Sequence, residues 1–181
     1  MTTLLGLSGS LRSGSFNTGL LRAAAGEMPK GSDLVIGSIA GVPLYDADLE
    51  AKGTPQPVLA LRDQLVEADG LLLATPEYNG GIPGVFKNAL DWIGSGEGAK
   101  LFDGKPVAVI GASPMGFGTL SAQTAWLQVL RALKADQWHG GRLTVSKAPK
   151  MFDEAGKLTD DATRKNLATF LAGFVGAIRG A

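Results

Sequence analysis

The stretch TLLGLSGSLRSGSFN at residues 3–17 decides the predicted fold, because it joins a buried strand to a helix through a loop of glycine and hydroxyl residues. The run TLLGL at its start is short and apolar, which is typical of a strand covered on both faces. Helical spacing of apolar residues begins at Thr18. A strand, a loop and a helix in this order form the first half of a β-α-β unit.

Four more apolar runs repeat this arrangement along the chain. Each is bounded by glycine, proline or serine and predicts a buried strand, at 34–39, 70–75, 107–111 and 142–145. Segments with helical spacing alternate with the runs, at 18–27, 57–68, 84–93, 120–135 and 160–179. This alternation predicts an α/β fold with a five-stranded parallel sheet, right-handed crossovers and helices on both faces.

The composition excludes several kinds of function. Lysine plus arginine and aspartate plus glutamate both total 17, so no net charge attracts nucleic acid or a membrane surface. The absence of cysteine excludes disulfides, thiol nucleophiles and cysteine metal sites. We expect a single domain over residues 1–181, cytoplasmic and without membrane insertion, since neither a signal peptide nor an apolar run of about 18 residues is present.

The loop GLSGSLRSGSFN at residues 6–17 has the residues of a phosphate-binding site. A helix start presents unpaired N–H groups to an anion, serines add hydroxyl donors, and Arg12 can pair with two phosphate oxygens. A nucleoside triphosphate loop has a lysine directly after its last glycine, but here Ser15 follows Gly14. The G-x-G-x-x-G pattern of a dinucleotide-binding fold is also missing. A simpler interpretation is that Ser15 and Asn17 cap the helix and the glycines only turn the chain.

Two further loops follow predicted strands and precede predicted helices. The second begins at Pro76, and its prolines and glycines restrict the turn while Tyr78 offers an aromatic surface on which a planar heterocycle could lie. The alternative is that Tyr78 only packs on the surface and Asn79-Gly80 makes a tight turn. The third loop, GASPMGFGT at residues 111–119, offers backbone amides, or is an ordinary strand-to-helix turn. Ligands of open parallel sheets bind at such loops.

Three motifs in these loops resemble those of a known family. They are GSLRSGSFN at 9–17, ATPEYNGGIPGVFKNALDWI at 74–93 and GASPMGFG at 111–118. In this order and spacing they resemble the NADPH-dependent FMN reductases, a flavodoxin-like group that includes bacterial quinone and chromate reductases. The resemblance spans most of the chain, and the second motif is far more specific than any glycine pattern.

The resemblance implies a flavodoxin-like three-layer fold that binds FMN, with three sets of cofactor-binding residues. Those implied for the phosphate are Ser10, Arg12, Ser15, Phe16 and Asn17. Those implied for the border of the isoalloxazine are Pro76, Glu77, Tyr78 and Asn79, with Ser113 and Gly116 from the third loop. Met115 stands where the family often has glycine.

The reaction implied by the resemblance needs no catalytic side chain and no metal, because a bound flavin carries the chemistry. NADH or NADPH would reduce the FMN and leave, and a quinone, chromate, a ferric chelate or an azo compound would then be reduced in a ping-pong cycle. The alternatives are a flavodoxin-type electron carrier and a flavin-free regulatory module of the same fold. The neutral charge argues against the carrier, and retention of Arg12 argues against the module.

The remaining distinctive residues suggest structural roles. His139 is the only histidine, and without a cysteine partner we expect it to be structural or at the surface. The three tryptophans predict core or subunit contacts. In segment 84–93 part of an apolar stripe, together with Trp92, predicts a dimer contact, and the resemblance implies a homodimer or homotetramer. The stripe consists of Val85, Phe86, Ala89, Leu90 and Ile93.

Overall fold

In the computed structural model, which describes residues 1–180, six strands form one sheet in which every neighbouring pair is parallel. The order across the sheet is β2-β1-β3-β4-β5, and β6 also pairs with β4. The strands are β1 (Thr2–Ser8), β2 (Ser32–Gly37), β3 (Gly70–Ala74), β4 (Pro106–Ala112), β5 (Asp136–Gln137) and β6 (Leu143–Val145). The predicted α/β fold with a parallel sheet is confirmed.

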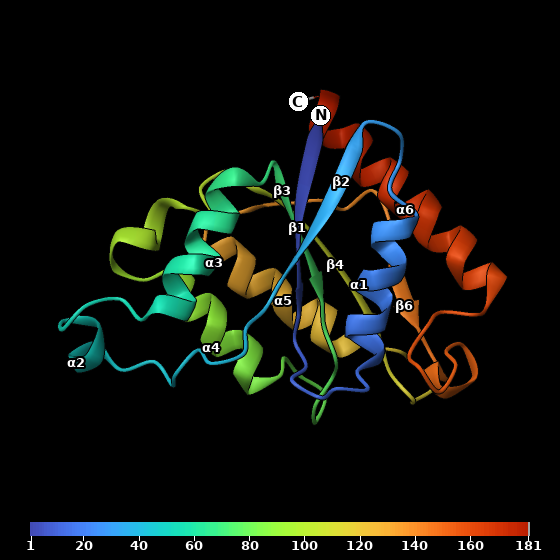
Figure 1. The fold of residues 1–181 in the computed structure, drawn as a ribbon, viewed down its shortest axis with the longest axis horizontal. Coiled ribbons are helices and arrows are strands. Elements are labelled where there is room, and N and C mark those ends of the chain that lie inside the picture. Colours follow the sequence, from blue (N-terminus) through green and yellow to red (C-terminus); the bar gives the residue numbers. More distant parts are fainter. Residues whose placement is uncertain (181) are drawn as a thin grey trace.

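Helices cover both faces of this sheet (Figure 1). One layer contains α1 (Phe16–Gly26) and α6 (Asp161–Gly180), and the other contains α3 (Gln56–Glu67), α4 (Gly84–Ile93) and α5 (Leu120–Ala132). Three short helices complete the chain: α2 (Ala47–Glu50) and the 3-10 helices η1 (Gly96–Lys100) and η2 (Ala148–Lys150). All five predicted helices are present, and α4 has the predicted bounds.

The fifth position in the sheet differs from the prediction of one strand at 142–145. Two short strands share it, because β5 pairs with Pro106 and Val107 whereas β6 pairs with Ile110, Gly111 and Ala112. The backbone N–H of Trp138 still donates to the Val107 carbonyl of β4 at 2.9 Å, and residues 139–142 leave the sheet. A two-residue strand with the sequence Asp-Gln has no apolar run, so the sequence pattern did not reveal β5.

Two apolar cores lie on opposite faces of the sheet, because successive strand residues point to opposite sides. In β1, Leu4 belongs to the core beneath α1 and α6, whereas Leu5 and Leu7 belong to the core beneath α3, α4 and α5. Trp126 of α5 is fully buried in the second core and meets the Phe86 ring edge-on at a centroid distance of 5.0 Å. The strands thus bind both helical layers into one structure.

Most of the apolar stripe of α4 faces this second core. Phe86 and Leu90 are completely buried in it, and Trp92 is completely buried beside Tyr45, whose ring it meets at a centroid distance of 5.0 Å. These three side chains are therefore covered within the chain, and among the apolar residues of α4 only Val85 is exposed. A dimer contact through this helix stays a prediction.

The segment before α3 is fixed to α4 by side-chain hydrogen bonds. The carbonyl oxygen of Pro43 accepts from Asn88 Nδ2 at 2.7 Å and from Trp92 Nε1 at 2.9 Å. The backbone N–H of Tyr45 donates to Asn88 Oδ1 at 2.8 Å. Leu44, between these two anchored residues, is 82% exposed and therefore projects from a fixed backbone.

Glu50 fixes the other end of this segment. Its carboxylate accepts from the Ser95 hydroxyl at 2.6 Å and from the Tyr45 hydroxyl at 2.9 Å. The hydrogen bond from Ser95 has the largest effect on the pKa of Glu50, and both bonds lower it. The bond between Tyr45 and Glu50 also raises the pKa of Tyr45. The buried Arg62 donates to the carbonyl oxygens of Trp92 and Ser95 at 2.8 and 2.7 Å, which ties α3 to the end of α4.

Gly9, just after β1, marks a close contact between the first and second loops. Its N–H donates to the Ala74 carbonyl at 2.9 Å, which brings its Cα against the Phe86 ring and Pro76. A Cβ at this position would overlap the Phe86 ring and would lie 2.9 Å from Pro76 Cδ. Only glycine permits this approach.

We therefore expect Gly9→Ala to lower the free energy of unfolding by about 1–3 kcal/mol, the usual cost of forcing an extra methyl group into a packed core. Urea denaturation of the protein without added ligand measures this. Gly14→Ala is the matched control in the same loop, because a Cβ there meets nothing within 4 Å. Equal stability of the two variants would refute the close packing of Gly9.

Candidate functional site

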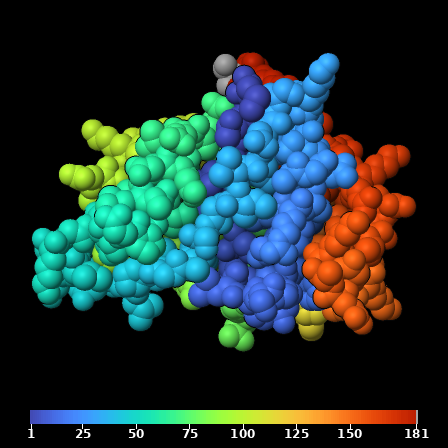
Figure 2. Space-filling model, viewed as in Figure 1, coloured from blue at the N-terminus to red at the C-terminus, as the bar shows by residue number. Residues whose placement is uncertain are grey.

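The three loops with candidate binding residues meet at one edge of the sheet. They follow β1, β3 and β4, and the carboxyl ends of parallel strands lie on the same side. Figure 1 shows all three at the lower edge of the molecule, and in Figure 2 the tips of the second and third loops, in green and yellow, protrude beside the first, in blue. The sequence prediction that these loops converge is correct.

The first loop leads into α1 with several free backbone donors. Ser15 is the N-cap, and its Oγ accepts from the Thr18 N–H at 3.3 Å. Among residues 1–180 the backbone N–H groups of Ser13, Gly14, Phe16 and Asn17 have no protein acceptor. These donors at a helix N-terminus are the arrangement that an anion requires.

Arg12 adds a positive charge to the same loop. Its side chain is exposed, and Nη2 donates to the Gly14 carbonyl at 2.9 Å. The guanidinium carbon lies 6.0 Å from the centre of the Phe16 ring, so the arginine folds back over the start of α1. Arg12 takes part in no ion pair with the described residues, and Ser10 and Ser13 add hydroxyls. The donors in this loop fit a phosphomonoester.

Asn17 has a different partner from the one the sequence suggested. Its side chain is buried, with 3% exposure, and its Nδ2 donates to the Ala112 carbonyl at 2.9 Å. Its Oδ1 accepts from the Ala112 N–H at 2.8 Å. The amide therefore joins the first loop to the end of β4, and only the backbone N–H of Asn17 remains free for a ligand.

The second loop contains a tight turn. Tyr78 and Gly81 exchange two backbone hydrogen bonds of 3.1 and 3.0 Å, with Asn79 and Gly80 at positive φ of 51° and 74° between them. The interpretation of Asn79-Gly80 as a tight turn is thus correct. Tyr78 is half exposed, and the N–H groups of Asn79 and Gly80 have no acceptor among residues 1–180. The turn therefore presents both an aromatic ring and free donors at this edge.

Glu77 connects the second loop to α5. Its Oε2 accepts from the backbone N–H of Ala122 at 3.0 Å, in the first turn of that helix. A carboxylate at this position satisfies a free helical donor and is favoured by the helix dipole. Pro76 beside it is buried. Both residues hold the turn in place, which periodicity in the sequence could not indicate.

Ser113 organises the third loop. It is 5% exposed, its Oγ accepts from the Met115 N–H at 3.1 Å, and its own N–H donates to the Val145 carbonyl at 2.9 Å. Gly116 is exposed at the loop tip, flanked by Met115 and Phe117, which are 69% and 84% exposed. Phe117 was not among the site residues predicted from the sequence. Its position between two glycines in a loop could have indicated an exposed aromatic side chain.

Gly111 was also missed, although a glycine inside a strand often marks a close approach of two backbones. A Cβ there would overlap Thr119 and the carbonyl oxygen of Thr75. The second and third loops are therefore in contact at their bases. Within residues 1–180 no group of three or more potential metal ligands gathers at this edge or elsewhere, and no helix is long and apolar enough to span a membrane.

The fold and this edge of the sheet define a class: a flavodoxin-like α/β protein with donors for a phosphate in its first loop and an aromatic turn in its second. The sequence pattern of the NADPH-dependent FMN reductases matches residues 2–150. The chain belongs to this family.

Named relatives cover nearly the whole chain. An NAD(P)H-dependent FMN reductase of Pseudomonas aeruginosa is 44% identical over 90% of this chain and 87% of its own length. A 2-hydroxy-1,4-benzoquinone reductase of a Burkholderia species is 36% identical over 94% of this chain and 93% of its own. Among solved structures, the flavoenzyme NAD(P)H:(acceptor) oxidoreductase FerB of Paracoccus denitrificans superimposes with a TM-score of 0.89 and 32% identity, covering 99% of this chain and 98% of FerB.

We expect Asn17→Ala to lower the free energy of unfolding by about 1–3 kcal/mol, because it leaves the buried N–H and carbonyl groups of Ala112 without their partner. Urea denaturation measures the change. Ser13→Ala is the control in the same loop, since Ser13 is exposed and its hydroxyl forms no bond with the described residues, and it should change stability by less than about 0.5 kcal/mol. If Asn17→Ala is as stable as Ser13→Ala, the Asn17 bonds do not hold the loops together.

Proposed function

We propose that the chain is an FMN-dependent NAD(P)H:acceptor oxidoreductase that reduces quinones and other small electrophilic acceptors, including chromate, ferric chelates and azo compounds. The observation that carries the proposal is the set of unpartnered amides at the start of α1 beside Arg12, which forms no ion pair with the described residues. An anion is the ligand that such a set favours. Family membership supports the FMN phosphate as this anion.

The first loop would hold the phosphate mainly through its backbone. The N–H groups of Phe16 and Asn17 would donate to it, and the hydroxyls of Ser10 and Ser15 would add further bonds, because the Ser15 Oγ that caps α1 keeps its own hydrogen. Arg12 would leave its contact with Gly14 and supply a charge-assisted bond. We favour FMN over FAD because the donors of this loop suit one terminal phosphate, and because the loop lacks the G-x-G-x-x-G pattern of dinucleotide-binding folds.

The second and third loops would border the isoalloxazine. Tyr78 offers its ring, Asn79 and Gly116 offer free backbone N–H groups, and Pro76 and Glu77 hold the turn. Ser113 would act through its bonds within the third loop. Bound FMN supplies the chemistry, by accepting a hydride from NAD(P)H and passing electrons to the acceptor.

The chain's own residues would bind and orient the cofactor and leave one face of it open to partners. Amides that donate to ring carbonyl oxygens stabilise negative charge there. Asn79, Gly80 and Gly81 follow Tyr78 in the turn. These small residues would leave space for a nicotinamide ring or a quinone. An electron carrier of the flavodoxin type needs an acidic surface that attracts its protein partners. The zero net charge of this chain argues against such a surface.

We further propose that residues 1–181 form one cytoplasmic FMN-binding domain that assembles as a homodimer or homotetramer. The assembly is supported by large apolar side chains that are exposed near the site and on the segment before α3. These are Leu11, Leu44, Met115 and Phe117. Large apolar side chains grouped at a surface are typical of subunit contacts. Light scattering measures the assembly.

We expect Arg12→Ala to weaken FMN binding by about one to two decades, since a charge-assisted hydrogen bond contributes roughly 1.5–3 kcal/mol. The rate at which NADPH reduces the bound flavin should change much less, because Arg12 would touch only the phosphate. Fluorescence titration with FMN gives the affinity. The control is Arg22→Ala, an exposed arginine of α1 outside the loop, which should bind FMN normally. Unchanged affinity in Arg12→Ala would exclude Arg12 from the phosphate site.

The purified protein should carry FMN and lose its visible absorption on anaerobic addition of NADPH or NADH. Addition of a quinone should then restore the absorption. Mass analysis of the released cofactor identifies it, and the absorption spectrum follows the cycle. A flavin that neither nicotinamide cofactor reduces would favour the electron carrier, and a protein that takes up no FMN would favour the flavin-free module.

A further inference from the structure

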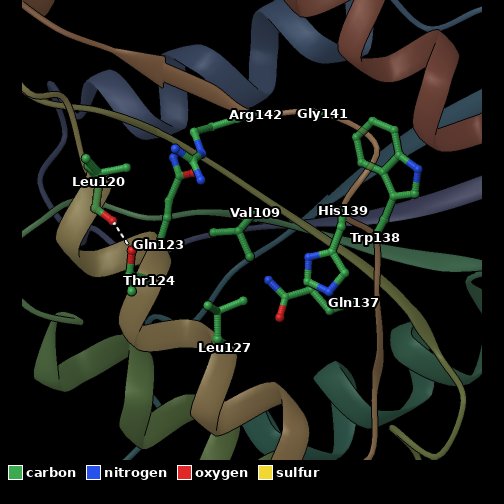
Figure 3. Close-up of a pocket in the computed structure, with 10 residues that line it drawn as sticks. All are labelled: Val109, Leu120, Gln123, Thr124, Leu127, Gln137, Trp138, His139, Gly141 and Arg142. Carbon is green, nitrogen blue, oxygen red and sulfur yellow. Dashed lines mark hydrogen bonds between the residues drawn. The ribbon is translucent and has the colours of Figure 1, made fainter.

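A cavity of about 390 Å³ lies at the edge of the sheet, lined by residues outside the three loops of the candidate site (Figure 3). It opens where the edge strand is interrupted, because β5 ends at Gln137 and β6 begins only at Leu143. Residues 138–142 run outward around the gap, and α5 forms the opposite wall. The volume falls within the range of small-molecule sites.

The cavity combines an apolar floor with a polar wall. Val109 of β4 lies at its centre, and Leu120 and Leu127 of α5 extend the apolar surface. Figure 3 shows the imidazole of His139 beside the amide of Gln137 on one side of Val109. Arg142 lies on another side, near Gln123 of α5. A ligand with both an apolar body and a polar end matches this lining.

The charge on the polar wall has one sign. Neither Arg142 nor His139 forms an ion pair with any residue among 1–180, and no acidic side chain of the described residues lines the cavity. Asp136, the nearest acidic residue along the strand, lines an adjoining cavity of about 160 Å³, which shares Gln137, Trp138 and His139 with this one. The guanidinium of Arg142 has a planar set of donors that fits a carboxylate through two parallel hydrogen bonds.

The wall formed by α5 is held rigidly. Gln123 Nε2 donates to the Thr119 hydroxyl at 3.1 Å and to the Leu143 carbonyl at 2.9 Å, so α5 is fixed to β6 across the end of the cavity. The Thr124 hydroxyl donates to the Leu120 carbonyl at 2.9 Å. A wall that is already fixed loses little conformational entropy when a ligand binds.

We propose that this cavity binds a small aromatic carboxylate. Its carboxylate pairs with Arg142 and accepts from His139, and its ring covers Val109 and the leucines of α5. The apolar floor distinguishes this ligand from inorganic phosphate, which gains nothing from burying Val109. No residue of the three loops lines the cavity, so a ligand here would not occupy the candidate FMN site itself.

The test is a titration of the ¹⁵N-labelled, FMN-loaded protein with benzoate, followed by NMR. We expect the backbone signals of Val109, His139, Gly141 and Arg142 to shift with a dissociation constant on the order of 1 mM, as suits a ligand of this size. Benzamidine, which has the same shape and the opposite charge, should shift none of them. Inorganic phosphate should bind at least several-fold more weakly than benzoate.

Two variants and one control variant separate charge from shape. Arg142→Gln should raise the dissociation constant of benzoate about tenfold, whereas Arg131→Gln should leave it unchanged, because Arg131 is an exposed arginine of α5 that does not line the cavity. Thr124→Trp fills part of the cavity from the exposed face of α5, keeps Arg142 and His139 and should also abolish binding. Circular dichroism confirms that each variant is folded.

Three results would overturn the proposal. Equal weakening by Arg142→Gln and Arg131→Gln would mean that only diffuse charge attracts benzoate. Shifts confined to residues 78–81 would mean that benzoate lies against the flavin. Absence of shifts up to ~10 mM benzoate would mean that the cavity has no affinity for aromatic carboxylates.

Discussion

The pair of hydrogen bonds between the Asn17 side chain and the backbone of Ala112 is the interaction on which the candidate site depends. It connects the start of α1 to the end of β4, two strand positions across the sheet. Glu77 adds a comparable link from the second loop to α5. Three loops that are far apart in the sequence are thereby held in fixed positions, so a ligand that binds them all does not have to order them first.

The same constraint explains which polar groups are satisfied and which are free. The Asn17 amide, which reaches between loops, is buried and bonded on both sides, whereas the amides at the loop tips have no partner among the described residues. Unpaired donors are costly in the interior but can be left at an exposed edge, where water or a ligand bonds to them. Gly9 and Gly111 complete the arrangement, since only glycine permits the loop bases to approach so closely.

The sequence predicted what depends on local pattern. The sequence predicted the buried strands β1, β3 and β4, the bounds of α4 and the donor-rich start of α1 from apolar runs, helical spacing and the residues Ser15 and Arg12. It also predicted β2 as buried, but Val35 and Ile36 of this edge strand are exposed. The sequence could not predict the features that depend on contacts between distant segments. Asn17 has the same local signature whether its amide faces a ligand or Ala112, and the α4 stripe has the same pattern whether it packs on its own sheet or on a partner. The residues Asp136 and Gln137 form a strand only because Pro106 and Val107 lie beside them.

The central claim is that the free amides of the first loop hold the phosphate of FMN, and a comparison of FMN with riboflavin tests it most directly, because the two differ only in that phosphate. Hydrogen exchange of the backbone amides, followed by NMR, is the measurement. FMN should slow exchange at Gly14, Phe16 and Asn17 strongly, riboflavin should leave these amides unprotected, and both should protect Asn79 in the second loop. Equal protection of the first loop by both ligands, or none by either, would contradict the account.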